Sequence, residues 1–207
     1  MVSAEGASPW LIVVTGPAAN GKSTLAAWLG EQLSLPFISK DGIKEILFDT
    51  LGWRDREWSK WLGRASVEVL FYFVRVLLAR SQSMVLENVF HPEMVSATFQ
   101  ALQHDTGCGI LQIICAAEPA VNFERFRQRA ELGVRHPGHV DLQCLDEFTV
   151  WLQQERSMRL EVEGPVIEVD TTEWAAVSYE AILKQIRSHL NRSEGRSTTR
   201  PGDAAIG

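Results

Sequence analysis

The stretch "GPAANGKST", residues 16–24, constrains this chain more than any other because of what stands on either side of it. It directly follows "LIVVT" (11–15), a short apolar run rich in β-branched residues that predicts a buried parallel strand. The spacing is Gly-x-x-x-x-Gly-Lys-Ser, and a helix is expected from Gly21 onward. Glycines let the backbone curl so that successive N–H groups point inward, and the helix start adds its positive dipole end. The pattern and its setting predict a phosphate-binding loop.

Each polar residue of this loop has a separate expected role. Lys22 would reach the β- and γ-phosphates of a nucleotide, Ser23 would place its hydroxyl on Mg²⁺, and Thr24 could bind the α-phosphate. A glycine-rich turn with an incidental lysine is the alternative, which the agreement of motif and setting disfavours. The residues expected to bind the nucleotide in this loop are Gly16, Pro17, Ala18, Ala19, Asn20, Gly21, Lys22, Ser23 and Thr24.

Strands and helices alternate along almost the whole chain. Apolar runs predict strands at 11–15, 36–39, 83–89, 109–116 and 165–170. Helices are expected from Gly21, at 41–51 with Asp41 as the cap, at about 55–80, behind Pro92 and Pro119, and at 174–190. This order predicts an α/β fold, a five-stranded parallel sheet with helices on both faces, in which ligands bind at the carboxyl ends of the strands.

Length and composition narrow the class of protein. The 207 residues suit one domain, expected over 1–191, and the polar segment 192–207 is expected to be a disordered tail. A net charge of −6 argues against non-specific nucleic-acid binding. Three cysteines without close pairing indicate free thiols and a cytoplasmic location rather than a disulfide framework or zinc site. No signal peptide and no membrane-spanning run are expected.

Two carboxylates stand where expected strands end. Asp41 follows the second strand in "SKDGIKE" and would face the γ-phosphate, where it could accept the proton of an attacking hydroxyl. Alternatively, Asp41 only caps its helix. Glu87 ends the third strand in "LENVF", where a buried charge needs a partner such as Mg²⁺-bound water or a substrate hydroxyl. A structural pair with an arginine is the alternative for Glu87, and aspartate is the more usual residue at such a metal position.

Arginines gather after the fourth expected strand. Arg125 and Arg129 are four residues apart on one helix face, and "GVRHPGHVD" adds Arg135 in a stretch punctuated by Gly and Pro. These side chains could close over a triphosphate as a mobile lid, at about 125–142, and neutralise the charge of the transition state. A solvated charged helix is the alternative.

Two further clusters each have two interpretations. The H-x-x-H-x-D order of His136, His139 and Asp141 would suit a metal site, although this spacing in a loop is weak evidence. Between the second and third strands the chain carries three tryptophans, Trp53, Trp58 and Trp61. Tryptophans near a cleft could stack on a planar or sugar-like substrate, or could pack at helical spacing.

Five segments together resemble the small P-loop kinases, the group of chloramphenicol phosphotransferase, gluconate kinase, zeta-toxin and polynucleotide kinase. The segments are "TGPAANGKSTLA", "ISKDGIKEILFDTLG", "VLENVF", "ERFRQRAELGVRHPGH" and "VIEVDTT", and the resemblance covers roughly residues 10–190. It implies a P-loop NTPase three-layer fold of the nucleoside-kinase type with an arginine-rich lid, and ATP–Mg²⁺ as phosphoryl donor. By position it implies Asp41 as catalytic base, Arg125 near the adenine, Arg129 and Arg135 as phosphate clamps, and Asp170, Thr171 and Thr172 beside the nucleotide base.

The sequence therefore predicts an ATP-dependent kinase that phosphorylates a hydroxyl of a small molecule. The expected catalytic residues are Lys22, Asp41, Arg129 and Arg135, and the expected metal ligands are Ser23 and Glu87. The acceptor is expected within about 42–80, with contacts from Asp41, Lys44, Trp53, Trp58, Trp61, Glu87 and His136. Two alternatives stay open: a nucleic-acid end kinase, against which the acidic charge counts, and a toxin-like or regulatory module that hydrolyses ATP slowly. The identity of the acceptor and the oligomeric state are not predicted.

Overall fold

The computed structural model of the chain describes residues 8–154 and 157–194, and the side chains as far as residue 191. Its centre is a sheet of five strands: β1 (Trp10–Thr15), β2 (Phe37–Ser39), β3 (Met84–Glu87), β4 (Gly109–Ala116) and β5 (Val166–Asp170). The strand order is β2-β3-β1-β4-β5, and every neighbouring pair is parallel. The predicted α/β fold is confirmed, and each predicted strand is present to within a few residues.

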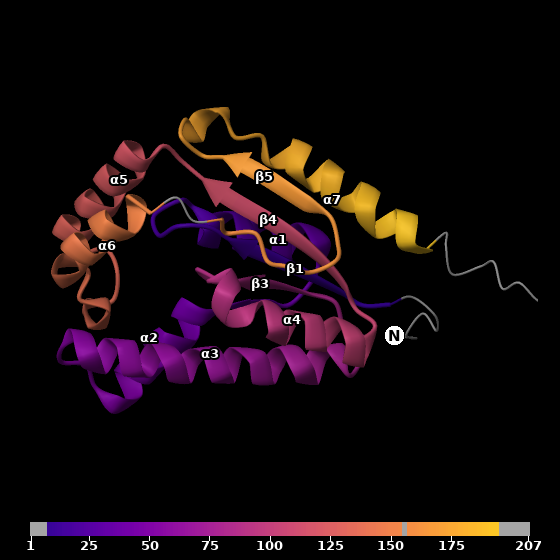
Figure 1. The fold of residues 1–207 in the computed structure, drawn as a ribbon, viewed down its shortest axis with the longest axis horizontal. Helices are drawn as coiled ribbons and strands as arrows, with labels where there is room; N and C mark the ends of the chain where they lie inside the picture. The colour runs from indigo at the N-terminus through magenta and orange to yellow at the C-terminus, as the bar shows by residue number, and fades with distance from the viewer. Residues whose placement is uncertain (1–7, 155–156, 195–207) are drawn as a thin grey trace, which may run out of the picture.

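Helices cover both faces of this sheet (Figure 1). They are α1 (Lys22–Leu33), α2 (Lys40–Leu51), α3 (Arg56–Leu78), α4 (Pro92–Thr106), α5 (Pro119–Leu132), α6 (Leu145–Leu152) and α7 (Tyr179–Glu194). Short 3₁₀ turns stand at Pro137–His139, Asp141–Cys144 and Trp174–Ala176. Among these described elements, none is a helix with the length and apolar character that crossing a membrane requires.

Side chains of β1 alternate between two layers of the core. Leu11 and Val13 belong to an apolar cluster with side chains of α3 and α4, whereas Ile12 and Val14 belong to a second cluster with α1 and α7. All four residues are fully buried. A strand covered on both faces needs an apolar residue at every position, which is why β1 is a continuous apolar run in the sequence. The result is the predicted three-layer arrangement of helices, sheet and helices.

The carboxyl edge of the sheet is flanked by two groups of helices. In Figure 1, α5 and α6 stand together beyond the ends of β4 and β5, and α2 and the first turns of α3 lie below them. β1 ends in the middle of this edge, between β3 and β4. The loop that follows β1 therefore opens at the centre, with one helical group on either side, which is where parallel sheets of this kind bind ligands.

The cap of α2 differs from the sequence prediction. Ser39 has the extended backbone of an N-cap residue, and its hydroxyl accepts a hydrogen bond from the N–H of Gly42 at 3.0 Å. Asp41 lies one residue inside the helix, in its first turn. The prediction that Asp41 caps this helix is therefore wrong, and its carboxylate is available to other partners.

Two other helix assignments also differ. Residues Trp174–Ala176 form a separate 3₁₀ turn, so the last helix begins at Tyr179 rather than at Trp174. α6 was not predicted as a helix. α7 continues to Glu194, and the rest of the tail predicted to be disordered, 195–207, lies outside the described residues.

A buried glutamine ties an irregular segment to the sheet. Gln112 of β4 is fully buried; its Nε2 donates to the carbonyl of Leu160 at 3.2 Å, and its Oε1 accepts from the N–H of Leu160 at 2.8 Å. Leu160 is itself buried and belongs to neither a helix nor a strand. The N–H of Leu160 therefore relies on Gln112, whereas its carbonyl also accepts from the N–H of Val162 at 3.0 Å.

We expect Gln112→Leu to lower the free energy of unfolding by about 1–3 kcal/mol, because leucine fills the space but leaves the buried N–H of Leu160 without its partner and removes one of the two partners of its carbonyl. Urea unfolding followed by circular dichroism measures this change. The matched control is Gln32→Leu on α1, where the side chain is exposed and the expected change is below about 0.5 kcal/mol. A Gln112→Leu value as small as the control's would show that the two hydrogen bonds contribute little.

Candidate active site

A cavity of about 590 Å³ opens at the carboxyl edge of the sheet. Its walls come from the loop after β1, the first turns of α2, the end of β3, and α5 and α6. The predicted site residues that line it are Ala18, Ala19, Asn20, Gly21, Lys22, Ser23, Thr24, Asp41, Lys44, Glu87, Arg125, Arg129 and Arg135. The fold thus brings the predicted phosphate loop, both carboxylates and the arginines to one space.

The loop after β1 adopts a backbone that its glycines make possible. Gly16 has a φ of 138°, and a Cβ there would lie 2.0 Å from the carbonyl oxygen of Cys115. Gly21 has a φ of 67°, and the ring of Trp174 occupies the space where its Cβ would point. Asn20 is fully buried and donates to the same Cys115 carbonyl at 3.2 Å. The loop is therefore fixed against β4 before α1 begins.

Lys22, Ser23 and Glu87 meet at the end of β3. The Nζ of Lys22 donates to the carbonyl of Pro17 at 2.7 Å and lies 4.0 Å from Oε1 of Glu87. Burial lowers the pKa of Lys22 and raises the pKa of Glu87, and the attraction between the two opposes both changes. The Ser23 side chain lies close enough to Glu87 to lower the pKa of that carboxyl, against the larger effect of burial. The two groups predicted to hold Mg²⁺ are thus adjacent, and the predicted phosphate-binding ammonium lies beside them.

Two arginines of α5 differ in the hydrogen bonds that their guanidinium groups make. The Nε and Nη2 atoms of Arg129 are buried without a hydrogen-bond partner among the described residues, and the nearest carboxylate oxygen, of Asp141, lies 3.4 Å from Nη2. Arg125 instead donates to the carbonyls of Thr171 and Thr172, at 2.7 Å each. Unpaired guanidinium donors on a cavity wall suit the oxygens of a phosphate, so Arg129 indicates an anionic ligand.

Asp41 is held by two cations. Lys40 Nζ lies 2.9 Å from one carboxylate oxygen, and Arg135 contacts the other while its Nη1 donates to Asp141 at 3.0 Å. Burial alone would raise the pKa of Asp41, but the charges of Lys40 and Arg135 lower it well below its usual range. The carboxylate is therefore ionised but occupied. A hydroxyl that approaches Asp41 in this structure would meet a carboxylate already paired with Lys40 and Arg135.

The lid segment, residues 125–142, rests on one acidic face of α2. This face carries three carboxylates at four-residue spacing: Asp41, Glu45 and Asp49. Arg135 contacts the first, His139 Nε2 lies 2.8 Å from the second, and His136 Nε2 lies 3.1 Å from the third. The ring of Phe48 stacks on His136, with 5.1 Å between the ring centroids. The lid thus contacts α2 along its length through one ion pair, two histidine–carboxylate contacts and the ring of Phe48.

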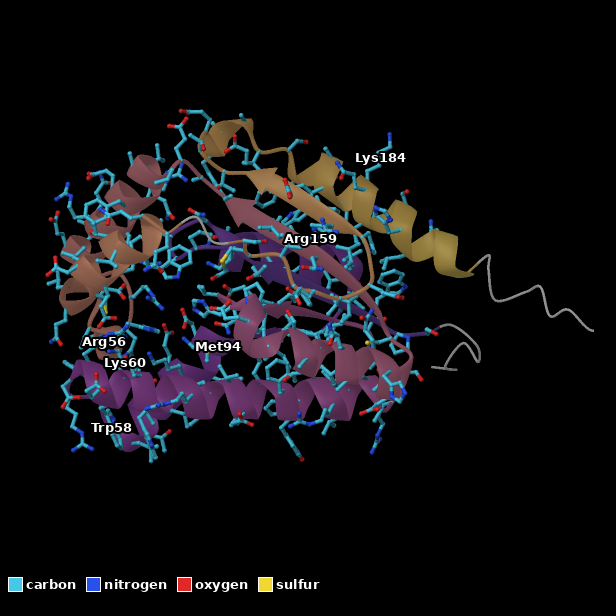
Figure 2. The ribbon with its side chains drawn as sticks, in the orientation of Figure 1. Arg56, Trp58, Lys60, Met94, Arg159 and Lys184 are labelled. Carbon is cyan, nitrogen blue, oxygen red and sulfur yellow. The ribbon has the colours of Figure 1, made fainter. Side chains whose placement is uncertain are left out.

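A second contact joins α6 to α3. Glu147 of α6 accepts from Arg56 Nη2 at 2.6 Å, and its other oxygen lies 3.2 Å from Lys60 Nζ. Figure 2 shows Arg56 and Lys60 pointing from α3 towards α6, whereas Trp58 points to the opposite side of α3. The helices on the two sides of the cavity are therefore connected across its opening.

The alternative of a metal site in the lid is wrong. His136 and His139 face carboxylates of α2, whereas Asp141 faces the guanidinium of Arg135. Within the described ranges, no group of three or more His, Cys, Asp or Glu side chains is arranged to hold a metal ion. Each member of the H-x-x-H-x-D pattern has a separate partner in the docked lid.

The three tryptophans predicted to contact the acceptor do not line the cavity. Trp58 stacks on Trp61 with 5.1 Å between ring centroids, donates its Nε1 to the carbonyl of Gly52 at 2.9 Å, and has Arg54 4.0 Å above its ring. Trp53 and Trp61 are about half exposed. The cluster packs at the outer rim of α2 and α3, which agrees with the packing alternative, and the substrate role of Trp53, Trp58 and Trp61 stays a prediction.

Six other predicted site residues do not line the cavity: Gly16, Pro17, His136, Asp170, Thr171 and Thr172. Gly16 and Pro17 contribute through the backbone of the loop. Asp170 accepts a hydrogen bond from the N–H of Thr172 at 2.8 Å, which closes a turn. The carbonyls of this turn accept hydrogen bonds from Arg125, which lines the cavity. His136 contacts Asp49 and Phe48 of α2, and its predicted contact with the acceptor stays a prediction.

The cavity also contains residues that the sequence analysis did not assign: Lys40, Arg56, Asn88, Glu147, Phe148 and Trp151. Three of these belong to α6, the helix that was not predicted. Its segment "LDEFTVWL" is apolar at helical spacing, and Phe148 packs on Phe126 of α5 with 4.3 Å between ring centroids. That spacing was the available signal, but eight residues are too few for it to stand out.

Comparison with known proteins places the chain among P-loop proteins. The profile of a family described as an AAA domain matches residues 11–155. A "putative kinase" from Chloroflexus aurantiacus J-10-fl is 35% identical, with a TM-score of 0.78, over 88% of this chain and 98% of that one. None of the curated proteins matches the chain.

Two more distant structures share the fold. A gluconokinase from Sinorhizobium meliloti 1021 is 20% identical, with a TM-score of 0.51, over 92% of this chain and 97% of that one. A sugar kinase from Janibacter sp. HTCC2649 is 15% identical, with a TM-score of 0.55, over 92% of this chain and 99% of that one.

His139 connects the lid to α2 as a neutral ring. Its Nε2 donates to Glu45 at 2.8 Å, and its Nδ1 accepts from Arg135 Nη2 at 2.9 Å. Burial, and then the charge of Arg135, lower the pKa of His139 to about 2. The contact therefore depends on a histidine that stays unprotonated in the folded chain.

We expect the free energy of unfolding to decrease as the pH falls below about 6.5, the pKa of histidine in an unfolded chain. Below that pH the unfolded chain binds a proton that folded His139 does not, at a cost of up to about 1 kcal/mol per pH unit. Urea unfolding between about pH 7 and pH 5 measures the slope. His139→Gln, which keeps a donor towards Glu45, should have a shallower slope; equal slopes would contradict the neutral ring.

Proposed function

The chain belongs to the AAA domain family and to the small P-loop kinases, and we propose that it is an ATP-dependent phosphotransferase acting on a hydroxyl of a small molecule. The observation that carries this proposal is one cavity lined by Lys22, by the unpaired donors of Arg129 and by Asp41. The cationic groups of Lys22 and Arg129 suit the phosphates of a nucleotide, and the Asp41 carboxylate suits a hydroxyl that accepts the phosphoryl group. The kinase name of the 35% identical relative agrees with it.

The donor side of the proposed reaction is the loop and α5. The backbone N–H groups at the start of α1 and the Lys22 ammonium would bind the phosphates, with Arg129 adding its two unpaired donors. Arg125, held by the turn after β5, would stand at the adenine side. These groups are fixed by the fold before a ligand arrives, which lets them stabilise charge on the transferring phosphoryl group at little reorganisation cost.

Mg²⁺ fits beside the loop on the chemistry of the groups present. Ser23 and Glu87 offer a hydroxyl and a buried carboxylate on the wall of one cavity, and magnesium takes oxygen ligands directly or through water. The ion would supply positive charge to the phosphate oxygens. The raised pKa of Glu87 has burial as its main cause, and a cation next to the carboxylate would favour its ionised form.

The oxygen of the acceptor hydroxyl would attack the γ-phosphorus of ATP while the bond from that phosphorus to the leaving ADP breaks. Asp41 would receive the proton of the hydroxyl in this step. Arg135 occupies this carboxylate here, and a bound triphosphate would offer Arg135 a new anionic partner. Movement of Arg135 from Asp41 to the phosphates would expose the base only when the donor is in place. The lid thus has a defined role in the proposal: it couples nucleotide binding to the release of Asp41.

Acceptor-dependent formation of ADP tests the function. A panel of hydroxyl compounds that includes polyols, sugars, sugar acids, sugar phosphates and nucleosides is added to the protein with ATP and Mg²⁺. The proposal requires at least one compound to raise the rate of ADP formation above the rate with ATP alone. A slow rate that no compound changes would instead favour a regulatory ATP-hydrolysing module.

Lys22→Ala should weaken ATP–Mg²⁺ binding by at least about tenfold, because a charge-assisted contact to the phosphates is lost. Calorimetric titration measures the affinity. Lys184→Ala is the matched control, because Lys184 lies on the exposed side of α7, as Figure 2 shows. The ATP affinity of this variant should equal that of the wild type. Unchanged ATP affinity in Lys22→Ala would exclude the assigned role.

Asp41→Asn should lower acceptor-dependent turnover by roughly 10²–10⁴-fold while ATP affinity and the melting temperature stay close to those of the wild type. The asparagine keeps the shape of the side chain but cannot take the proton, and Ser39 remains as the helix cap. Asp49→Asn, two turns along the same face of α2, is the control and should retain turnover. Retained turnover in Asp41→Asn would place the base elsewhere, with Glu87 as the next candidate.

A further inference from the structure

Lys44 of α2 is a buried cation without a counter-charge. It is 4% exposed and lines the cavity. Its ammonium donates one hydrogen bond, to the Ser59 hydroxyl at 2.8 Å, and lies 5.1 Å above the ring centroid of Phe48. No ion pair joins it to a carboxylate in the described part of the chain, where Asp41 and Glu45 are engaged by other residues. A buried charge in this condition is costly unless a ligand supplies the missing partner.

A second lysine converges on the same point. Gly63 of α3 lies opposite Lys40 and Lys44, and a Cβ on Gly63 would be 3.7 Å from Lys44 Nζ and 4.0 Å from Lys40 Cε. The side chains of Lys40 and Lys44 thus reach the same place beside Gly63. Lys40 also lines the cavity, and it gives only one of its three donors, to Asp41. Two ammonium groups that share a partly buried space repel each other unless an anion stands between them.

The other charged side chains near Lys44 do not remove this excess of positive charge. Arg56 and Arg135 also line the cavity and add positive charge, and the carboxylates that they contact are shared with further cations, Glu147 with Lys60 and Asp141 with Arg129. Burial, and then the charge of Lys40, lower the pKa of Lys44 to about 7. Lys44 therefore holds its proton weakly, and an anion next to it would restore the charged form.

We propose that Lys44 and Lys40 form the subsite for an acidic group of the acceptor, a carboxylate or a phosphate, so that the acceptor carries both a hydroxyl and an acid. The statement that the acidic group belongs to the acceptor rests on the proposed function. The anion subsite itself does not depend on that function. Asp41 and Lys44 are three residues apart on α2, so their Cβ atoms are neighbours at roughly 5–6 Å. The reacting hydroxyl and the acidic group are therefore separated by about one helical turn.

Small anions test the subsite without requiring catalysis. Acetate, methyl phosphate and the neutral glycerol are titrated separately into isotope-labelled protein saturated with Mg²⁺ and a non-hydrolysable ATP analogue, which fills the phosphate loop. The lysine side-chain resonances are followed by NMR, and the Lys44 signal is assigned by its loss in Lys44→Met. We expect the Lys44 signal to shift with at least one anion and not with glycerol. The anion that binds more tightly identifies the carboxylate or the phosphate class.

Two variants separate the subsite from a structural role of Lys44. Lys44→Met keeps the length of the side chain and removes the charge, whereas Ser59→Ala removes the hydrogen bond and keeps the ammonium. We expect anion affinity to fall by about tenfold or more in Lys44→Met and to persist in Ser59→Ala. If Lys44 only joined α2 to α3, both variants would lower the melting temperature and neither would change anion binding selectively.

The outcomes distinguish this inference from the function on which it rests. Among the compounds that raise ADP formation, acidic acceptors should have the lower KM, and Lys44→Met should raise that KM about tenfold and leave the KM of neutral acceptors unchanged. Neutral compounds as the best acceptors, with no Lys44 signal shifted by either anion, would overturn the inference and leave the kinase proposal standing. A shift of Lys44 with anions and no acceptor-dependent ADP formation would support the subsite and contradict the kinase.

Discussion

The contact between Gly16 and the carbonyl of Cys115 is the constraint on which the site depends. The absent Cβ of Gly16 lets the chain leave β1 close to β4, and Asn20 bonds to the same carbonyl oxygen. One residue later on β4, the carbonyl of Ala116 accepts from both the N–H and the hydroxyl of Thr171, at 2.7 and 2.9 Å. The end of β4 thus fixes the loop after β1 and the turn after β5. The start of α1, with Lys22 and its unpaired N–H groups, can therefore point into the cavity without help from a ligand.

The opposite wall of the cavity is held by ion pairs and hydrogen bonds as well as by packing. The lid lies on the acidic face of α2, and α6 is joined to α3 through Glu147. Ion pairs of this kind can be exchanged, because a phosphate offers Arg135 the same charge that Asp41 does. In the proposed reaction, the loop after β1 and α5 are in place before the nucleotide binds. Arg135, on the opposite wall, would change partners when the nucleotide binds. The unpaired charge of Lys44 belongs to this second wall.

Local sequence patterns predicted much of the fold, including the loop after β1 that lines the cavity. The continuous apolar run of β1 and the glycine spacing behind it indicate buried strand, loop and helix over consecutive residues, so no distant contact had to be known. The cap of α2 was misassigned because Ser39 and Asp41 are both good capping residues two positions apart, and local pattern does not choose between them. The short α6 depends on its packing against α5, which only the folded chain supplies.

The acceptor side was less predictable because its contacts join distant parts of the chain. Arg135 and Asp41 are 94 residues apart, and Lys44 finds Ser59 on another helix. The tryptophans illustrate the same difficulty: their spacing is compatible with a substrate wall, but Trp58 turns to the outer rim, where Trp61 and the carbonyl of Gly52 satisfy it. Residue types alone do not show which face of α3 meets the lid.

The fate of the γ-phosphate tests the central claim most directly, that one cavity brings a nucleotide and a hydroxyl acceptor together. ³¹P NMR of the protein with ATP, Mg²⁺ and an equimolar mixture of hydroxyl compounds follows every phosphorus as ATP is consumed. The account predicts a new phosphomonoester resonance that grows in step with ADP and is absent in Asp41→Asn. Growth of inorganic phosphate alone, at a rate that the hydroxyl compounds do not change, would contradict it.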